Sequence, residues 1–160
     1  MVASTPSGME LPFISVILPV RNEARHIALS LGAVLRQQYP AWRMEILVVD
    51  GESTDHTIRV IGSLPGAERV RVIVNPRRIQ AAGMNAALRE ARGEIVVRVD
   101  GHTIIDPDYL MQCVHALAMH GAQNAGGSIR PVGTTRKGRA IACAARSQFA
   151  VPGAFHIELP

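Results

Sequence analysis

Two aspartates stand directly after runs that are rich in apolar, β-branched residues, and a glycine follows each of them. The run Ile95–Val99 ends at Asp100, and the run Ile46–Val49 ends at Asp50. In open α/β sheets the carboxyl ends of parallel strands meet at one edge, and ligands bind at that edge. The two carboxylates therefore predict a single polar site that is built from two strand ends.

His102 follows Asp100 by two residues, so both side chains lie on the same side if the strand geometry continues. A carboxylate and an imidazole together suit Mn²⁺ better than Mg²⁺, which prefers oxygen ligands and water. The alternative is that Asp100 caps a turn and that His102 is an ordinary loop histidine. Asp100 and His102 are thus candidate ligands of a divalent cation.

Strands and helices alternate along the chain, and their lengths favour an α/β fold with a mostly parallel sheet and helices on both faces. Strands are predicted over Phe13–Pro19, Glu45–Val49, Val70–Val74 and Ile95–Val99. Helices are predicted from Asn22 or Glu23 to Gln38, from Ser53–Thr57 onward, over Gln80–Arg92 with Gly93 as C-cap, and from Asp106 to His120. After Asn124, Gly126–Ile129 could form a strand, and the alanine-rich segment Ala140–Phe149 predicts a helix.

The composition fits one ordered domain and narrows the choice of ligands. The 160 residues are 48% hydrophobic and 19% charged, and the net charge of +4 favours an anionic ligand. Aromatic residues make up only 4% of the chain, which argues against nucleic-acid binding by base stacking. Cys113 and Cys143 are expected to be free thiols in a reducing compartment. We expect neither a signal peptide nor a membrane-spanning helix.

Three motifs, in order and at matching spacing, resemble those of family-two glycosyltransferases, which have the Rossmann-like GT-A fold. S-V-I-L-P-V-R-N-E at Ser15–Glu23 looks like the first-strand signature. V-V-D-G-E-S-T-D-H-T at Val48–Thr57 looks like the motif V-D-D-G-S-T-D-G-T, and V-D-G-H, which ends at His102, lies where the family has D-x-D. N-P-R-R-I-Q-A-A-G-M-N at Asn75–Asn85 is similar to the succinoglycan-type exopolysaccharide transferases.

The resemblance implies that a sugar is transferred from a nucleotide-sugar donor to a lipid-linked or polysaccharide acceptor, in surface or exopolysaccharide biosynthesis. A divalent cation, Mn²⁺ or Mg²⁺, would neutralise the leaving diphosphate. We expect a cytoplasmic protein with peripheral contact at the inner face of the membrane, and no nucleic-acid partner. The expected donor-binding residues are Pro19, Arg21, Glu23, Asp50, Arg78 and Asp100, and the expected metal ligands are Asp100 and His102.

Several of these residues have alternative interpretations. Asp50 could bind the nucleobase or ribose, or it could cap a turn or a helix. Asp55 is expected to be a cap at the start of its helix. Glu23 could reach the ribose hydroxyls or favour the positive end of the first helix. Arg77 and Arg78 could clamp a diphosphate at a helix N-terminus, although exposed loop arginines are common. Arg136, Lys137 and Arg139 predict a solvated face, with a lipid-phosphate contact as the alternative.

The chain departs from the family pattern at two points. Gly51 replaces the second aspartate of V-D-D, which can contact the nucleobase in the family. The catalytic base of the family, a carboxylate, lies in a second half that we expect to be absent from these 160 residues. We therefore expect a flexible tail over 1–12, a nucleotide-sugar-binding domain over 13–130, and an incomplete acceptor-side region over 131–160. The alternative function is a truncated, non-catalytic nucleotide-binding module.

Overall fold

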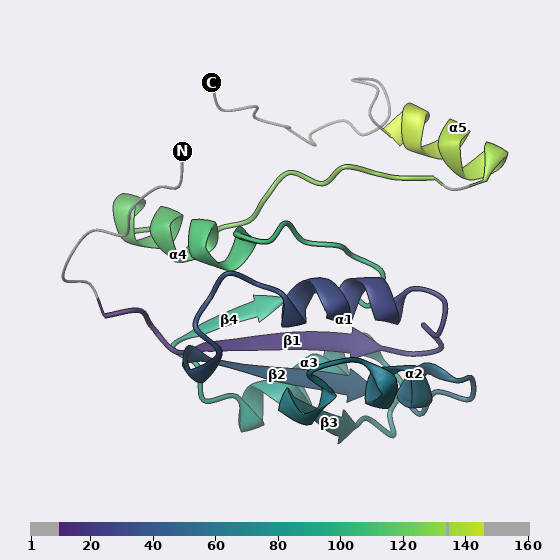
Figure 1. Ribbon diagram of the computed structural model, residues 1–160, viewed down its shortest axis with the longest axis horizontal. Helices are drawn as coiled ribbons and strands as arrows, with labels where there is room; N and C mark the ends of the chain where they lie inside the picture. Colours follow the sequence, from purple (N-terminus) through teal and green to yellow (C-terminus); the bar gives the residue numbers. More distant parts are fainter. Residues whose placement is uncertain (1–9, 134, 146–160) are drawn as a thin grey trace.

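Four parallel strands form one sheet in the order β3-β2-β1-β4 (Figure 1). The computed structural model describes residues 10–133 and 135–145. The register aligns Val20 with Asp50, and Asp50 with Val74, so the strands end at a common edge. The strands are β1 (Ile14–Val20), β2 (Met44–Asp50), β3 (Val70–Val74) and β4 (Ile95–Arg98). The predicted parallel α/β fold is therefore confirmed.

Helices cover both faces of the sheet because the side chains of each strand alternate between the faces. Val16 and Leu18 pack with Leu31 of α1 in the larger apolar cluster, which also includes residues of α2 and α4. Ile17 packs with Ala87 of α3 in the smaller cluster on the opposite face. The helices are α1 (Ile27–Leu35), α2 (Thr57–Ser63), α3 (Gln80–Glu90), α4 (Tyr109–His120) and α5 (Arg136–Ala145), with short 3₁₀ turns at η1 (Ala41–Arg43) and η2 (Ala67–Arg69).

A polar group at the amino end of the sheet, which we call the amino-end cluster, joins Ser15, Glu45, Arg92 and Gly93. Glu45 accepts hydrogen bonds from Ser15 Oγ at 2.6 Å and from the Arg92 backbone nitrogen at 2.7 Å, and it pairs with the Arg92 guanidinium at 3.0 Å. Burial acts to raise the pKa of Glu45, but the hydrogen bonds from Ser15 and Arg92, with the charge of Arg92, outweigh it and hold the pKa below its ordinary value. The cluster thus ties the segment before β4 to β1 and β2.

Gly93 is not the predicted C-cap, because α3 ends at Glu90 and Ala91 has an extended backbone. Gly93 is instead needed for close packing. A Cβ atom at this position would lie 2.3 Å from the backbone nitrogen of Ser15. The glycine therefore lets the α3–β4 connection pass directly against β1.

Other predictions about the elements were also wrong, including the start of α4, which lies at Tyr109 and not at Asp106. Helix α1 begins at Ile27 and not at Asn22 or Glu23, because Asn22 has a left-handed backbone with φ of 56°. The segment 126–129 forms no strand in the structure. The basic residues from Arg136 are already part of α5, whereas residues 146–149 of the predicted last helix lie outside the described residues.

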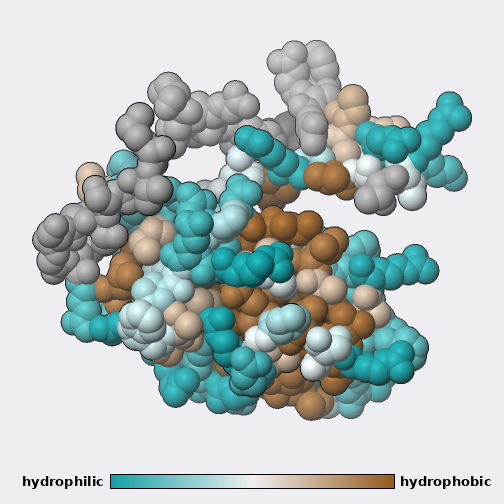
Figure 2. Space-filling model, in the orientation of Figure 1, coloured by the Kyte–Doolittle hydropathy of each residue, from teal (hydrophilic) through white to brown (hydrophobic). Residues whose placement is uncertain are grey.

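Apolar side chains also reach the surface around the sheet. Figure 2 shows brown apolar patches in the middle of this view, and the exposed apolar residues include Leu29 of α1 and Val72 and Val74 of β3. Over residues 10–133 and 135–145, no helix has both the length and the apolar character that crossing a bilayer requires.

Candidate functional site at the strand ends

A cavity of about 190 Å³ lies at the carboxyl ends of the strands, and we call it the strand-end cavity. The sheet order places β1 between β2 and β4, so the connections run in opposite directions from β1, which is where open α/β sheets bind ligands. The lining residues are Pro19, Val20, Arg21, Glu23, Val49, Gly51, Asn75, Arg78, Gln80, Asp100, Gly101 and His102. The structure thus brings together every residue of the predicted site except Asp50, whose neighbour Gly51 lines the cavity.

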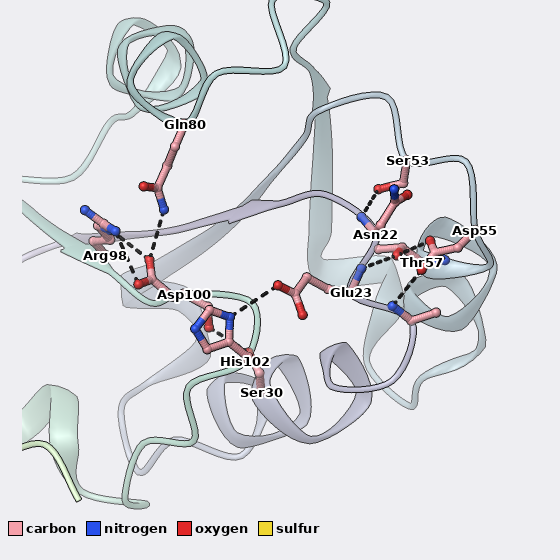
Figure 3. Close-up of polar contacts among 11 residues, drawn as sticks. Asn22, Glu23, Ser30, Ser53, Asp55, Thr57, Gln80, Arg98, Asp100 and His102 are labelled. Atoms are coloured by element: carbon pink, nitrogen blue, oxygen red, sulfur yellow. Dashed lines mark hydrogen bonds and ion pairs between the residues drawn. The ribbon is translucent and has the colours of Figure 1, made fainter. Parts of the chain in front are cut away.

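Asp100 is held by Arg98, the last residue of β4. The Arg98 Nε atom donates to Asp100 Oδ1 at 2.8 Å, and the terminal Arg98 nitrogen donates to Oδ2 at 3.2 Å (Figure 3). Gln80 approaches Oδ1 at 3.5 Å, and the hydroxyl of Ser30 donates to the Asp100 carbonyl at 3.2 Å. The Asp100 carboxylate therefore lies on the cavity wall with its charge already compensated.

His102 and Glu23 face each other across the cavity, with 3.2 Å between His102 Nδ1 and Glu23 Oε1 (Figure 3). The Glu23 side chain is 22% exposed and that of His102 is 62% exposed. Gly101 permits this approach, since a Cβ atom there would lie 3.0 Å from Val20 Cγ1 and 3.1 Å from Glu23 Cγ. The pair joins the loop after β1 to the loop after β4.

Asp50 is buried and acts within its own loop. Its Oδ1 atom accepts a hydrogen bond from the Ser53 hydroxyl at 2.5 Å, and its Oδ2 atom accepts one from the Ser53 backbone nitrogen at 3.1 Å. This is the turn-capping alternative for Asp50. The contact fixes the β2–α2 loop in the shape that places Gly51 on the cavity wall.

The loops after β1 and β2 are bonded to each other at several points. Asn22 receives a hydrogen bond from the Thr54 backbone nitrogen at 2.8 Å, and Thr57 Oγ1 accepts one from the Glu23 backbone nitrogen at 2.8 Å. Asp55 accepts from the Ala24 nitrogen at 3.1 Å and from Thr57, whose hydroxyl holds the pKa of Asp55 below its ordinary value. Asp55 therefore joins the loop after β1 to the first residue of α2, whereas the N-cap position that the sequence predicts for it belongs to His56.

Arginines occupy the other walls of the cavity. The stem of Arg21 lies against Gly51, where a Cβ atom would be 3.3 Å from Arg21 Cδ. Arg78 reaches the cavity from the loop after β3, and its Nε atom donates to Glu52 at 2.7 Å. Arg77 points elsewhere and lines a second cavity of about 370 Å³ with Asn85. The structure thus separates the two arginines of the predicted clamp, and only Arg78 belongs to the strand-end cavity.

The loops after β1, β2 and β3 each hold one non-glycine residue in the left-handed backbone region. These residues are Asn22, Glu52 and Arg78, with φ of 56°, 53° and 57°. The described chain has no other positive-φ residue except glycine. Such conformations cost about 1–3 kcal/mol each and concentrate at functional sites. Glu52 was not singled out from the sequence, although the motif V-D-D-G-S-T-D-G-T has glycine at that position, and glycine adopts this backbone readily.

The donor set of the cavity fits a cation only in part. Within the described residues, no three His, Cys, Asp or Glu side chains converge as a metal site. A Mg²⁺-type site needs only one or two protein carboxylates, however, because substrate phosphates and water supply the other ligands. Asp100 and His102 fit that smaller share, provided that Arg98 releases the Asp100 carboxylate.

Sequence reasoning missed Arg98, Asn75 and Glu52. Arg98 and Asp100 are two residues apart at the end of one strand, so the period-2 alternation could have predicted their contact. Asn75 is buried and donates from Nδ2 to the Ile79 carbonyl at 3.0 Å, which shapes the turn that carries Arg78. No local sequence pattern predicts that Asn75 shapes this turn.

Comparison with known proteins adds a family to this geometry. Residues 15–144 match the family model described as Glycosyl transferase family 2. The succinoglycan biosynthesis protein ExoA of Rhizobium meliloti is 31% identical over 144 residues, which cover 88% of this chain and 43% of that protein.

A second relative is a dolichyl N-acetyl-α-D-glucosaminyl phosphate 3-β-D-2,3-diacetamido-2,3-dideoxy-β-D-glucuronosyltransferase of Methanococcus voltae. It is 34% identical over 101 residues, which cover 61% of this chain and 32% of that protein. The chain therefore spans less than half the length of either relative.

The solved structures that resemble the chain include the mannosyltransferase PcManGT from Pyrobaculum calidifontis in complex with GDP-Man and Mn²⁺. The TM-score is 0.64 and the identity is 29%, with coverage of 89% of this chain and 42% of that one.

Proposed function

Since the chain belongs to glycosyl transferase family 2, we propose that it is the donor-binding part of an inverting, nucleotide-sugar-dependent glycosyltransferase. The acceptor is a lipid-linked saccharide or a growing polysaccharide, and the pathway makes surface or exopolysaccharide. The succinoglycan biosynthesis relative and the dolichyl-phosphate-linked relative support this acceptor class. The reaction takes place at the cytoplasmic face of the membrane, where lipid-linked acceptors would be reached by peripheral contact.

One observation carries the proposal. Residues from the ends of three separate strands, β1, β3 and β4, were chosen from sequence for a donor site and line a single cavity at the point where the sheet order reverses. The lining of the cavity includes two guanidinium groups, two carboxylates and an imidazole. A small apolar part of the lining includes Pro19 and Val49. A nucleoside diphosphate has matching groups, because it is anionic at one end and offers hydroxyl donors at the ribose.

We assign the binding roles from the chemistry of each side chain. Arg78 binds phosphate oxygens, since guanidinium–phosphate pairs are frequently bidentate. Glu23 accepts hydrogen bonds from the nucleoside. Asp50 is buried and contributes through its bonds to Ser53, which fix the loop that places Gly51 on the cavity wall. Arg21, which rests on Gly51, is positioned to stack on the base or to meet a phosphate.

Asp100 and His102 would hold a divalent cation, which neutralises charge on the departing diphosphate when bound. The Mn²⁺ in the mannosyltransferase structure supports this choice of ion. Within the chain, Arg98 keeps the Asp100 carboxylate compensated and oriented toward the cavity until a ligand enters. Gln80 adds a second donor on the same side.

The proposal is tested by titrating the folded chain with uridine and guanosine diphosphates, with and without Mn²⁺, by calorimetry and thermal denaturation. We expect binding of at least one diphosphate and an increase in affinity with Mn²⁺. Asp100→Ala should remove the increase. Absence of any nucleotide effect at millimolar concentration, in a sample shown to be folded by circular dichroism, would contradict the donor-site proposal.

A further inference from the structure

We propose that Glu52 is a specificity-determining residue of the strand-end cavity. In the free protein Glu52 forms an ion pair with Arg78, and the phosphate of the ligand replaces Glu52 in this pair. This inference rests on the proposed function. Arg78 lines the cavity, whereas the side chain of Glu52 approaches from outside the set of lining residues. In the free protein, the Glu52 carboxylate would therefore occupy the position on Arg78 that the anionic part of the donor takes when it binds.

The contact between the two residues is direct and accessible. Arg78 Nε donates to Glu52 Oε2 at 2.7 Å, and the terminal guanidinium nitrogen contacts the same oxygen. The side chains are 55% and 39% exposed, so neither partner is locked in the core. Exposed ion pairs are weak, and a phosphate can bind a guanidinium in the bidentate fashion open to a carboxylate. Replacing Glu52 by a phosphate as the partner of Arg78 therefore costs little.

Both residues of the Glu52–Arg78 pair have an unusual backbone conformation. Glu52 and Arg78 both have left-handed backbones, with φ of 53° and 57°, which residues with a Cβ atom rarely adopt. The motif V-D-D-G-S-T-D-G-T has glycine where this chain has Glu52, and glycine adopts this conformation without strain. The chain therefore keeps the glycine conformation but adds a carboxylate that reaches Arg78.

The turn below Arg78 restricts what can move. The Arg78 backbone nitrogen donates to the Asn75 carbonyl at 3.0 Å, and the buried Asn75 side chain donates to the Ile79 carbonyl at 3.0 Å. With its backbone held at both points, Arg78 can change partners only by rotating its side chain. Glu52 therefore controls how much of the Arg78 charge is free for a ligand, without any rearrangement of the loop.

The test compares diphosphate and nucleoside affinities in variants of the full 160-residue chain, using whichever of uridine or guanosine diphosphate binds the wild type. Glu52→Gln should tighten diphosphate binding roughly 1.5- to 5-fold, which is the range that a broken exposed ion pair of about 0.2–1 kcal/mol allows. Nucleoside binding should not change. Arg78→Gln should weaken diphosphate binding, and Glu52→Gln should have little further effect in the Arg78→Gln background.

Two further variants keep the test decisive. Glu68→Gln, on the exposed η2 turn, removes the same charge away from the cavity and should leave diphosphate affinity unchanged. Glu52→Gly places glycine at the left-handed position and should tighten diphosphate binding by the same factor. This second variant decides the test if Glu52→Gln folds poorly. Weaker diphosphate binding in both Glu52 variants, or an equal gain in the Arg78→Gln background, would overturn the proposal. If the wild type binds no diphosphate, the proposed function fails instead.

Discussion

At the scale of single residues, the charges around the strand-end cavity are paired with one another. Arg98 compensates Asp100, Glu52 compensates Arg78, and His102 faces Glu23. Each partner in these pairs is at least partly exposed, so the pairs add little to folding stability. Their consequence is for binding, because a ligand or cation must exchange with a side chain that is already in place.

Arg98 should compete with a cation for Asp100. In Arg98→Gln the Asp100 carboxylate has no guanidinium partner, so Mn²⁺ should bind it more readily. We expect the Mn²⁺ concentration that gives half of the metal effect on diphosphate binding to fall by a few fold. Calorimetric titration with Mn²⁺ at fixed diphosphate measures this. Arg59→Gln on α2 removes the same charge at an exposed position and should behave as the wild type. A weaker metal effect in Arg98→Gln would instead make Arg98 a required partner of the ligand.

His102 should determine which metal is preferred. In His102→Asp, an oxygen ligand replaces nitrogen and faces the Glu23 carboxylate, so we expect preference to move from Mn²⁺ toward Mg²⁺ and the dependence on metal to increase. Diphosphate affinities in the two metals, compared as a ratio, give the readout. A ratio equal to that of the wild type would remove His102 from the coordination shell.

The strand ends and the family resemblance together predicted most residues that line the cavity, but not the partners of those residues. Asp100 and His102 were predicted because parallel strands must end at one edge, whereas Pro19, Arg21, Glu23 and Arg78 were implied by the resemblance to family-two glycosyltransferases. The contacts of Arg78 with Glu52 and of Asp50 with Ser53 depend on loop backbones, and no periodicity specifies those. The side chains were predictable, whereas their pairing required the three-dimensional structure.

At the scale of elements, the strands were predicted to within one residue at every end, and the helix starts less consistently. α3 begins at Gln80 as predicted, whereas α1 and α4 begin later than predicted. β3 lies at its predicted bounds because its apolar run is sharply delimited. α1 starts later than predicted because Asn22 and Glu23 serve the β1–α1 loop and bond to Ser53 and Thr57. A polar residue before an apolar run can cap a helix or bind another loop, and sequence alone does not distinguish the two.

The amino-end cluster should make stability depend on pH through Glu45. The pKa of Glu45 is lower in the folded protein than in the unfolded protein, where it is about 4.3. The contribution of Glu45 to the free energy of unfolding is therefore fully present above about pH 4.3 and is lost as the pH falls through the pKa of the folded protein. We expect Glu45→Gln to reduce the free energy of unfolding by about 1–3 kcal/mol at pH 7 and by less in acid. Urea denaturation between pH 3 and pH 7 tests this, with Glu68→Gln as the control, and an equal loss at every pH would refute the electrostatic account.

Close packing at Gly93 gives a matched pair of glycine substitutions. Gly93→Ala should destabilise the protein by about 1–3 kcal/mol, because the new Cβ atom would lie 2.3 Å from a backbone atom of β1 that cannot move independently. Gly62 lies inside α2, where an added Cβ atom would meet nothing within 4 Å beyond the backbone of its own helix, so Gly62→Ala should stabilise by about 0.5–1 kcal/mol through helix propensity. Thermal denaturation of both variants is the measurement, and a neutral Gly93→Ala would show that the α3–β4 connection is looser than the structure describes.

At the scale of the whole molecule, donor binding and sugar transfer should separate. An inverting transfer needs a base for the acceptor hydroxyl, which typically contributes a factor of about 10²–10⁴. Asp106 and Asp108 are the acidic residues of the described chain after His102, and both lie beside Pro107 before α4, outside the set of residues that line the strand-end cavity. We therefore expect the 160 residues to bind donor but to transfer sugar negligibly.

The corresponding assay uses a lipid-linked acceptor and a panel of nucleotide sugars that includes UDP-GlcNAc and GDP-Man. Diphosphate binding measured on the same sample is the control for folding. Multiple turnovers by these 160 residues would show that they contain a base, and Asp106→Asn and Asp108→Asn would then identify it.

The position of β1 in the middle of the sheet also has a consequence during synthesis. Its partner β2 follows soon in the chain, but its other partner, β4, begins only at Ile95. At about 5–20 residues per second, a ribosome needs roughly 4–15 s to proceed from the end of β1 to the start of β4. During that interval the Ile14–Ile17 side of β1 has no strand beside it, and an open apolar edge attracts other chains. The nascent protein should therefore engage chaperones most strongly before the fourth strand emerges.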